Sequence, residues 1–131
     1  VISSYIIKNK LNNSYDLGFP TQYKIFKYLK KNNQEIIIIN SDDLIKNSKK
    51  ILRLFCKKLN IEFTNKMLTW PKGSRDSDGI WGKIWYEKVI NSNSFSSNIS
   101  KKKISIPLKY NKILQECNNI YEELNYYSLK G

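Results

Sequence analysis

Most residues whose types and spacing could do chemistry lie in one stretch, Trp70 to Tyr86. It holds all three tryptophans, one of the two arginines and three of the five glycines of the chain. Glycines let backbone N–H groups approach an anion, and an arginine binds a phosphate through two parallel hydrogen bonds. A tryptophan offers a face on which a base can stack. The stretch would suit a phosphorylated nucleotide.

A purely structural interpretation of this stretch is equally open. Trp81 and Trp85 are four residues apart, which is the spacing of a core pair on a helix. Arg75 has Asp76 and Asp78 close by in the sequence as partners for an ion pair. Spacing alone does not decide between the two interpretations.

A second candidate position follows the run of four isoleucines at Ile36 to Ile39. A short β-branched run between polar residues predicts a buried strand of a parallel sheet. Ser41, Asp42 and Asp43 would then form a turn just past the carboxyl end of that strand, where open α/β sheets bind ligands. Aspartates also form turns and cap helices, and that simpler role is favoured when these residues are taken alone.

Histidine is absent, and this excludes any histidine-based triad or general base within these residues. Cys56 and Cys117 are too few for a disulfide scaffold, and without histidine they fall short of a metal site. Each lies on the apolar face of an expected helix. We therefore expect two free thiols in a reducing compartment, the cytoplasm, and no metal.

The net charge of +12 first suggests a nucleic acid or an anionic membrane as partner. However, of the 23 basic residues all but Arg53 and Arg75 are lysines, and they are spread along the whole chain. Arginine is the residue that best fits phosphates and bases. We therefore interpret the charge as a solvated surface and expect no specific nucleic-acid partner. The longest apolar run, Ile36 to Ile39, is far too short to span a membrane.

Around these residues the apolar spacing predicts a mostly helical chain with one strand. Helices are expected over Val1 to Lys10, Pro20 to Lys31, Ser48 to Leu59, Asn65 to Leu68, Lys83 to Asn91 and Pro107 to Tyr127. Residues 92–103 are rich in serine, asparagine and lysine and should form a loop. The packing faces of the helices are expected to include Leu59, Val89 and Leu108. A lone strand cannot satisfy its own edges, so we expect partner strands of a parallel α/β sheet to lie upstream of Val1.

Three motifs carry a resemblance to a known family. They are S-D-D-L at Ser41 to Leu44, the helix sequence from Leu52 to Phe63, and M-L-T-W-P-K-G-S-R-D-S-D-G-I-W-G-K-I-W-Y from Met67 to Tyr86. In this order they resemble the C-terminal half of the bacterial sulfotransferase-like P-loop family. The opening V-I-S-S-Y resembles the segment that follows the family's R-x-P, and the resemblance covers nearly the whole chain except residues 92–103. It implies that residues 1–131 are a partial sulfotransferase-like domain, the C-terminal part of a parallel sheet with flanking helices.

The resemblance implies a site for 3′-phosphoadenosine-5′-phosphosulfate. Ser4 falls on the family serine that binds the 3′-phosphate, and Arg75 stands at the lysine of the family's glycine-rich 3′-phosphate motif. Gly79 and Trp81 match that motif's second glycine and its tryptophan. Its first glycine is replaced here by Asp76 or Ser77. Near the adenine, the resemblance places a group of three residues: Ser41, where relatives have a contacting tyrosine, and Thr69 and Trp70, which could compensate by stacking.

The implied reaction transfers a sulfuryl group to a hydroxyl or amine acceptor. It needs a phosphate-binding loop and a general base, and neither is found in this sequence. In the family both precede the serine matched by Ser4, so we expect the 131 residues alone to be inactive. Two alternatives remain: a basic, non-enzymatic binding module, and a P-loop relative that uses another nucleotide. The acceptor cannot be inferred from these motifs.

Overall fold

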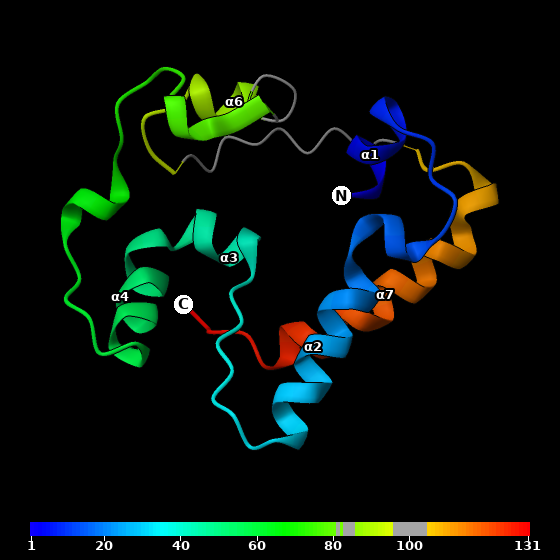
Figure 1. The fold of residues 1–131 in the computed structure, drawn as a ribbon, viewed down its shortest axis with the longest axis horizontal. Coiled ribbons are helices and arrows are strands. Elements are labelled where there is room, and N and C mark those ends of the chain that lie inside the picture. Colours follow the sequence, from blue (N-terminus) through cyan, green and yellow to red (C-terminus); the bar gives the residue numbers. More distant parts are fainter. Residues whose placement is uncertain (81, 83–85, 96–104) are drawn as a thin grey trace. The chain divides into compact units, whose positions relative to one another are not determined.

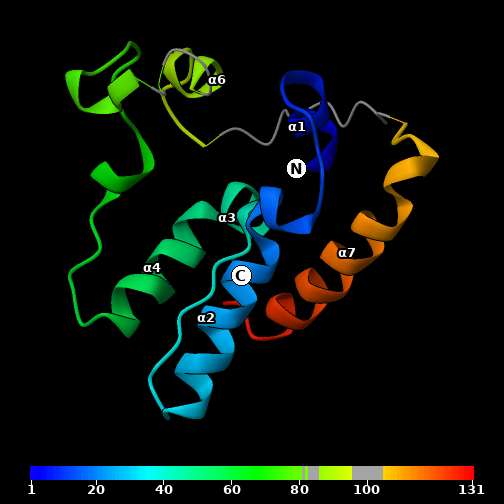
Figure 2. The ribbon, with the colours of Figure 1, turned by 45° about the vertical axis from the view of Figure 1, so that its right-hand side comes forward.

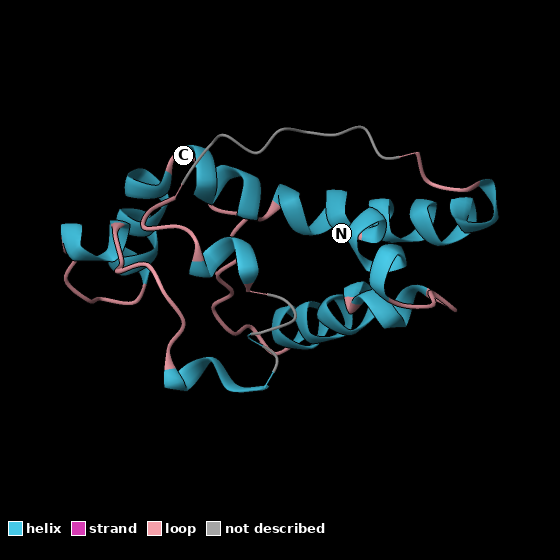
Figure 3. Cartoon of the chain, turned by 90° about the horizontal axis from the view of Figure 1, so that it is seen from above, coloured by secondary structure: helices cyan, strands magenta, loops and turns pink. Residues whose placement is uncertain are grey.

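The computed structural model describes residues 1–80, 82, 86–95 and 105–131. It divides into two compact units. Unit 1 consists of Val1–Ile38 and Ser100–Ser128, and unit 2 of Ile39–Ile99 and Leu129–Gly131. Figure 3 shows helices and loops over the described residues, and β pairing there is limited to isolated bridges. Within those same residues, no helix is long and apolar enough to cross a bilayer.

Unit 1 is built on two long helices, α2 (Phe19–Lys31) and α7 (Asn111–Tyr126). They lie side by side in Figures 1 and 2. The Phe26 ring packs 5.1 Å from the Tyr127 ring, and both Phe26 and Cys117 are buried. The Tyr23 hydroxyl donates a 2.6 Å hydrogen bond to Glu123, and this bond raises the pKa of Tyr23. These contacts join an early helix to a late one.

Shorter elements complete unit 1: helix α1 (Ile2–Lys8) and the 3₁₀ turns η1 (Ser14–Leu17) and η4 (Leu108–Tyr110). Turn η1 is fixed by the Asp16 carboxylate, which accepts hydrogen bonds from the backbone N–H groups of Asn12 and Asn13. Gly18 follows with φ 77°, a left-handed conformation that suits glycine and lets α2 begin at once.

Unit 2 begins with two consecutive helices, α3 (Ser41–Lys46) and α4 (Ser48–Lys58). Ile51 is fully buried, and Cys56 is buried with its sulfur 3.8 Å from that of Met67 in the turn η2 (Asn65–Leu68). The turn η3 (Asp76–Asp78) and the short helix α6 (Glu87–Ile90) complete the described elements.

The isoleucine run is extended and half-buried at Ile36 to Ile39, and it pairs through one isolated parallel bridge from Ile38 to Ser128. The partner strands expected upstream would lie outside this sequence, so the predicted parallel sheet stays a prediction. The turn predicted at Ser41 to Asp43 is wrong. The Asn40 side chain accepts a hydrogen bond from the Asp42 N–H, and two aspartates in the first turn favour a helix start.

The helices expected over Pro20 to Lys31, Ser48 to Leu59 and Asn65 to Leu68 are present to within a residue or two. The last helix begins at Asn111, because a separate 3₁₀ turn follows Pro107. Three residues expected on packing faces are instead exposed: Leu59, Val89 and Leu108. Leu59 and Leu108 stand at or beyond the ends of their helices, where a face defined by periodicity no longer holds. Ile84 and Trp85 lie outside the described residues, as does Trp81.

Candidate functional site

The site is built on two segments of unit 2 that run antiparallel. Thr69 pairs with Ser94 in an isolated antiparallel bridge, and the Trp70 N–H donates a 2.9 Å hydrogen bond to the Asn93 carbonyl. Further along, the Gly73 N–H donates to the Ile90 carbonyl at 2.9 Å. These backbone contacts hold residues 69–73 against residues 90–94.

The Trp70 side chain is fixed within this pairing. Its indole N–H donates a 3.2 Å hydrogen bond to the Ser92 hydroxyl, which itself donates to the Val89 carbonyl at 2.8 Å. The edge-on Phe95 ring lies 5.2 Å from the indole, with 87° between the ring planes. The indole therefore keeps one orientation while part of its surface stays open to solvent.

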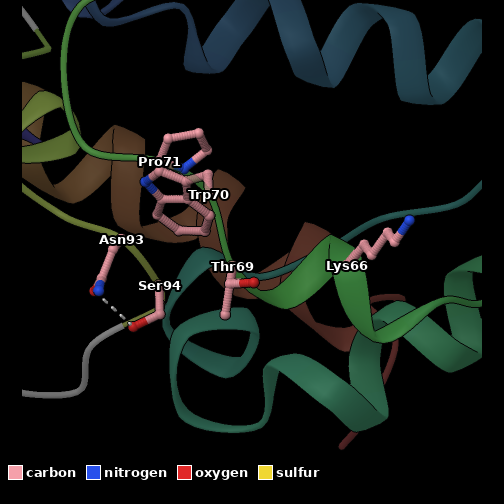
Figure 4. Close-up of a pocket in the computed structure, with 6 residues that line it drawn as sticks. All are labelled: Lys66, Thr69, Trp70, Pro71, Asn93 and Ser94. Carbon is pink, nitrogen blue, oxygen red and sulfur yellow. Dashed lines mark hydrogen bonds between the residues drawn. The ribbon is translucent and has the colours of Figure 1, made fainter.

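Two hollows share Trp70 as a wall. The larger has a volume of about 340 Å³ (Figure 4). Its lining residues are Lys66, Thr69, Trp70, Pro71, Asn93 and Ser94. The smaller, of about 40 Å³, is lined by Trp70, Gly73, Arg75, Asp78, Tyr86, Val89 and Ile90. Trp70 lines both hollows and Arg75 lines the smaller one, so an aromatic residue and an arginine, the residue types that suit a base and a phosphate, lie near each other in unit 2.

Arg75 opens the tight turn η3. Its N–H donates a 2.8 Å hydrogen bond to the Asp78 carboxylate, and its carbonyl accepts from the Asp78 N–H at 3.0 Å. The guanidinium makes no ion pair or hydrogen bond with any other residue that the structure describes. The ion pair with Asp76 or Asp78 allowed by the sequence is therefore not formed, and the five N–H donors of Arg75 remain available.

Gly79 ends this turn with φ 63° and ψ −170°, a region that is essentially accessible to glycine alone. A Cβ added there would meet no atom within 4 Å. The glycine is thus required by the backbone conformation rather than by close packing, and its surroundings leave room for another molecule. Gly82 differs, because an added Cβ would lie 2.8 Å from the Cβ of Asp78.

Ser41 and Ser4 are not among the residues that line these hollows, and Trp81 lies outside the described residues. Ser41 is exposed in the first turn of α3 and lines neither hollow. Ser4 belongs to unit 1, where its hydroxyl donates a 2.8 Å hydrogen bond to the Val1 carbonyl. The structure thus brings together Thr69, Trp70 and Arg75 of the predicted set, with Gly79 at the end of the Arg75 turn.

Four residues that line the larger hollow were not predicted from the sequence: Lys66, Pro71, Asn93 and Ser94. Asn93 and Ser94 belong to a stretch interpreted as a loop from its composition, and they are positioned by pairing with residues far away in the sequence. Periodicity could not have revealed this arrangement. Over the described part of the chain, no cluster of three or more acidic or cysteine side chains is arranged to hold a metal ion.

Comparison with known proteins gives two similarities. The chain matches the sulfotransferase domain family over residues 1–118. It is also 32% identical over 110 residues to branched-chain-amino-acid aminotransferase-like protein 2 of Arabidopsis thaliana, an alignment that covers 84% of this chain and 20% of that protein. The chain thus spans about a fifth of the length of this curated relative. No solved structure is significantly similar to it.

Proposed function

This chain belongs to the sulfotransferase domain family, and from this premise we propose that it forms the 3′-phosphoadenosine-binding part of a sulfotransferase. The whole enzyme would transfer a sulfuryl group from 3′-phosphoadenosine-5′-phosphosulfate to a hydroxyl or amine acceptor. The nucleotide supplies the activated sulfuryl group when it is bound. The residues of this chain would bind and orient it, and a phosphate-binding loop and a general base would come from other parts of the protein.

The observation that carries this proposal is the position of Trp70 between the two hollows. A purine stacked on the indole would occupy the larger hollow, whose volume of about 340 Å³ is at the small end of ligand pockets. The smaller hollow beside the same indole contains Arg75.

The Arg75 guanidinium, which has no partner among the described residues, supports a phosphate at this position. Lysine is the common cation of this chain. Arginine differs from lysine because its planar guanidinium can bind a phosphate through two hydrogen bonds at once, and this favours a phosphate beside the one arginine in the glycine-rich turn. The open space beside Gly79 would let the backbone come close to the same phosphate. A 3′-phosphate contact by Ser4 is proposed from the family resemblance alone, since its hydroxyl donates to the Val1 carbonyl in the structure.

The same premise leads to a proposal for the fold. In the whole domain, Ile36 to Ile39 would join a parallel sheet of the bacterial P-loop type, and the extended, half-buried backbone of these residues supports that role. The two buried free thiols, Cys56 and Cys117, support a reducing compartment such as the cytoplasm. We do not carry over the aminotransferase in the relative's name, because this chain matches only about a fifth of that protein.

Calorimetry on the full-length protein tests the proposal. It would compare adenosine 3′,5′-bisphosphate with adenosine 5′-monophosphate, which lacks the 3′-phosphate. Charge-assisted hydrogen bonds to that phosphate should make the bisphosphate bind about 10- to 150-fold more tightly. Equal affinities, or no binding of either nucleotide, would contradict the proposal.

A further inference from the structure

The larger hollow contains an amide group to which neither the fold nor the family resemblance gives a role. Asn93 lies on its wall, next to Ser94. In Figure 4 Asn93 and Ser94 lie on one side of the hollow and Lys66 lies on the opposite side. The wall thus combines an aromatic surface with a polar side chain.

The backbone fixes where this amide is presented. The Asn93 carbonyl accepts the 2.9 Å hydrogen bond from the Trp70 N–H, and Ser94 is bridged to Thr69. The amide and the indole are therefore carried by directly paired segments. A base stacked on Trp70 in this hollow would therefore lie near Asn93, which lines the same hollow.

The amide is also largely unused within the protein. Its Oδ1 accepts one long hydrogen bond, 3.4 Å, from the Ser94 hydroxyl. Its two N–H donors make no hydrogen bond with any residue in the described part of the chain, and the side chain is exposed. An asparagine amide can form up to four hydrogen bonds, so Asn93 keeps both donors and one acceptor position for a ligand.

We propose that the Asn93 side chain recognises the edge of the base in this hollow and selects a 6-aminopurine. This inference rests on the proposed function, because it takes the bound molecule to be a 3′-phosphonucleoside. Adenine presents its amino group as a donor next to a ring nitrogen acceptor, and an amide pairs with both at once. The 3.4 Å hydrogen bond from the Ser94 hydroxyl to Oδ1 favours the orientation in which the two amide N–H donors point away from Ser94.

Guanine is the informative competitor. It carries an acceptor oxygen at position 6, where adenine carries its amino donor. With Oδ1 on the Ser94 side, guanine would form one hydrogen bond fewer with the amide than adenine does, unless the amide turned over. A good bidentate pair discriminates against the wrong base by about 5- to 150-fold.

The test is calorimetry on the full-length protein with adenosine and guanosine 3′,5′-bisphosphates. The natural sequence should prefer the adenosine compound within that range. Asn93→Ala should lose most of the preference and still bind both compounds through their phosphates. Asn65→Ala is the matched control, because Asn65 is exposed in η2 and lines neither hollow. It should keep the preference.

The outcomes separate the two proposals. If neither bisphosphate binds, the proposed function fails and this inference fails with it. If both bisphosphates bind equally well to the natural protein, the inference alone is wrong. It is also wrong if Asn93→Ala keeps the preference for the adenosine compound. Asn93→Asp gives a second test should the alanine variant fold poorly. The carboxylate introduced by Asn93→Asp has the same shape as the amide but cannot donate a hydrogen bond to the base. The preference for adenine should therefore be smaller than in the natural protein, as in Asn93→Ala.

Discussion

The Asp78 carboxylate accepts a 2.8 Å hydrogen bond from the backbone N–H of Arg75, while the Arg75 guanidinium has no ion-pair partner among the described residues. The acidic neighbour therefore shapes the turn without neutralising the side chain. A cation presented in this way remains free to meet an anion from outside the chain. This relationship is the structural basis for placing a phosphate beside Arg75.

Removing that carboxylate should weaken nucleotide binding even though it makes the loop more positive. In Asp78→Ala the Arg75 N–H loses its partner, and the turn that positions the guanidinium loosens. We expect adenosine 3′,5′-bisphosphate to bind several-fold more weakly, by roughly the 0.5–1.5 kcal/mol of one hydrogen bond. Calorimetry would measure this change. Tighter binding would show that charge alone governs the site.

Ile51 is fully buried in α4, so it should be the most costly single truncation in unit 2. Ile51→Ala is expected to lower the free energy of unfolding by about 2–5 kcal/mol, through lost burial and a residual cavity. Ile61, which is 49% exposed in the same unit, is the matched control. Ile61→Ala should change stability by no more than about 0.5 kcal/mol. Urea denaturation would measure the free energy of unfolding of both variants. Similar losses of stability in the two would contradict the placement of Ile51 in the core of unit 2.

Asp16 should make the stability of unit 1 depend on pH. Its hydrogen bonds, above all that from the Asn12 backbone N–H, hold the pKa of Asp16 below its ordinary value. Because the folded pKa is lower than the unfolded one of about 3.9, the carboxylate stabilises the fold above the unfolded pKa. That contribution disappears as the pH falls through the folded pKa.

The comparison for Asp16 is the melting temperature of the natural protein and of Asp16→Asn across that range. We expect the variant to melt at a lower temperature near neutral pH, and the gap to close in acid. A gap that stays constant down to the lowest pH would mean that ionisation of Asp16 does not matter.

The two cysteines should be unreactive thiols in the folded protein. Both are buried and free, and burial, followed by the nearby Glu116, raises the pKa of Cys117. Iodoacetamide should label the peptides with Cys56 and Cys117 slowly in the native protein. After denaturation without reductant it should label both completely, as mass spectrometry would show. Peptides that stay unlabelled after denaturation would contradict this assignment.

The parts of the fold that could be predicted from sequence are those with local causes. The apolar spacing of the second helix, with Pro20 in its first turn, located α2, and the spacing from Ile51 located α4. The start of α3 was missed because one side chain, Asn40, decides between a helix and a turn. The isoleucine run indicated an extended segment, but its pairing depends on residues distant in sequence.

Part of the candidate site could also be predicted from the sequence, and part of it could not. Residue types drew attention to the stretch from Trp70 to Tyr86, because it combines a rare arginine with tryptophans and glycines, and the family resemblance then singled out Trp70 and Arg75. Asn93 and Ser94 could not be found in this way. The backbone pairing of residues 69–70 with residues 93–94 places them in the site, and no local sequence pattern indicates that pairing.

The most direct test of the central claim is the effect of Arg75→Ala on the binding of two nucleotides to the full-length protein. We expect adenosine 3′,5′-bisphosphate to bind about 10- to 150-fold more weakly, because the variant loses a charge-assisted hydrogen bond. Adenosine 5′-monophosphate should bind as it does to the natural protein. Lys72→Ala, which removes an exposed cation nearby, should affect both only slightly. Equal losses for the two nucleotides, or no loss for either, would contradict a 3′-phosphate contact by Arg75.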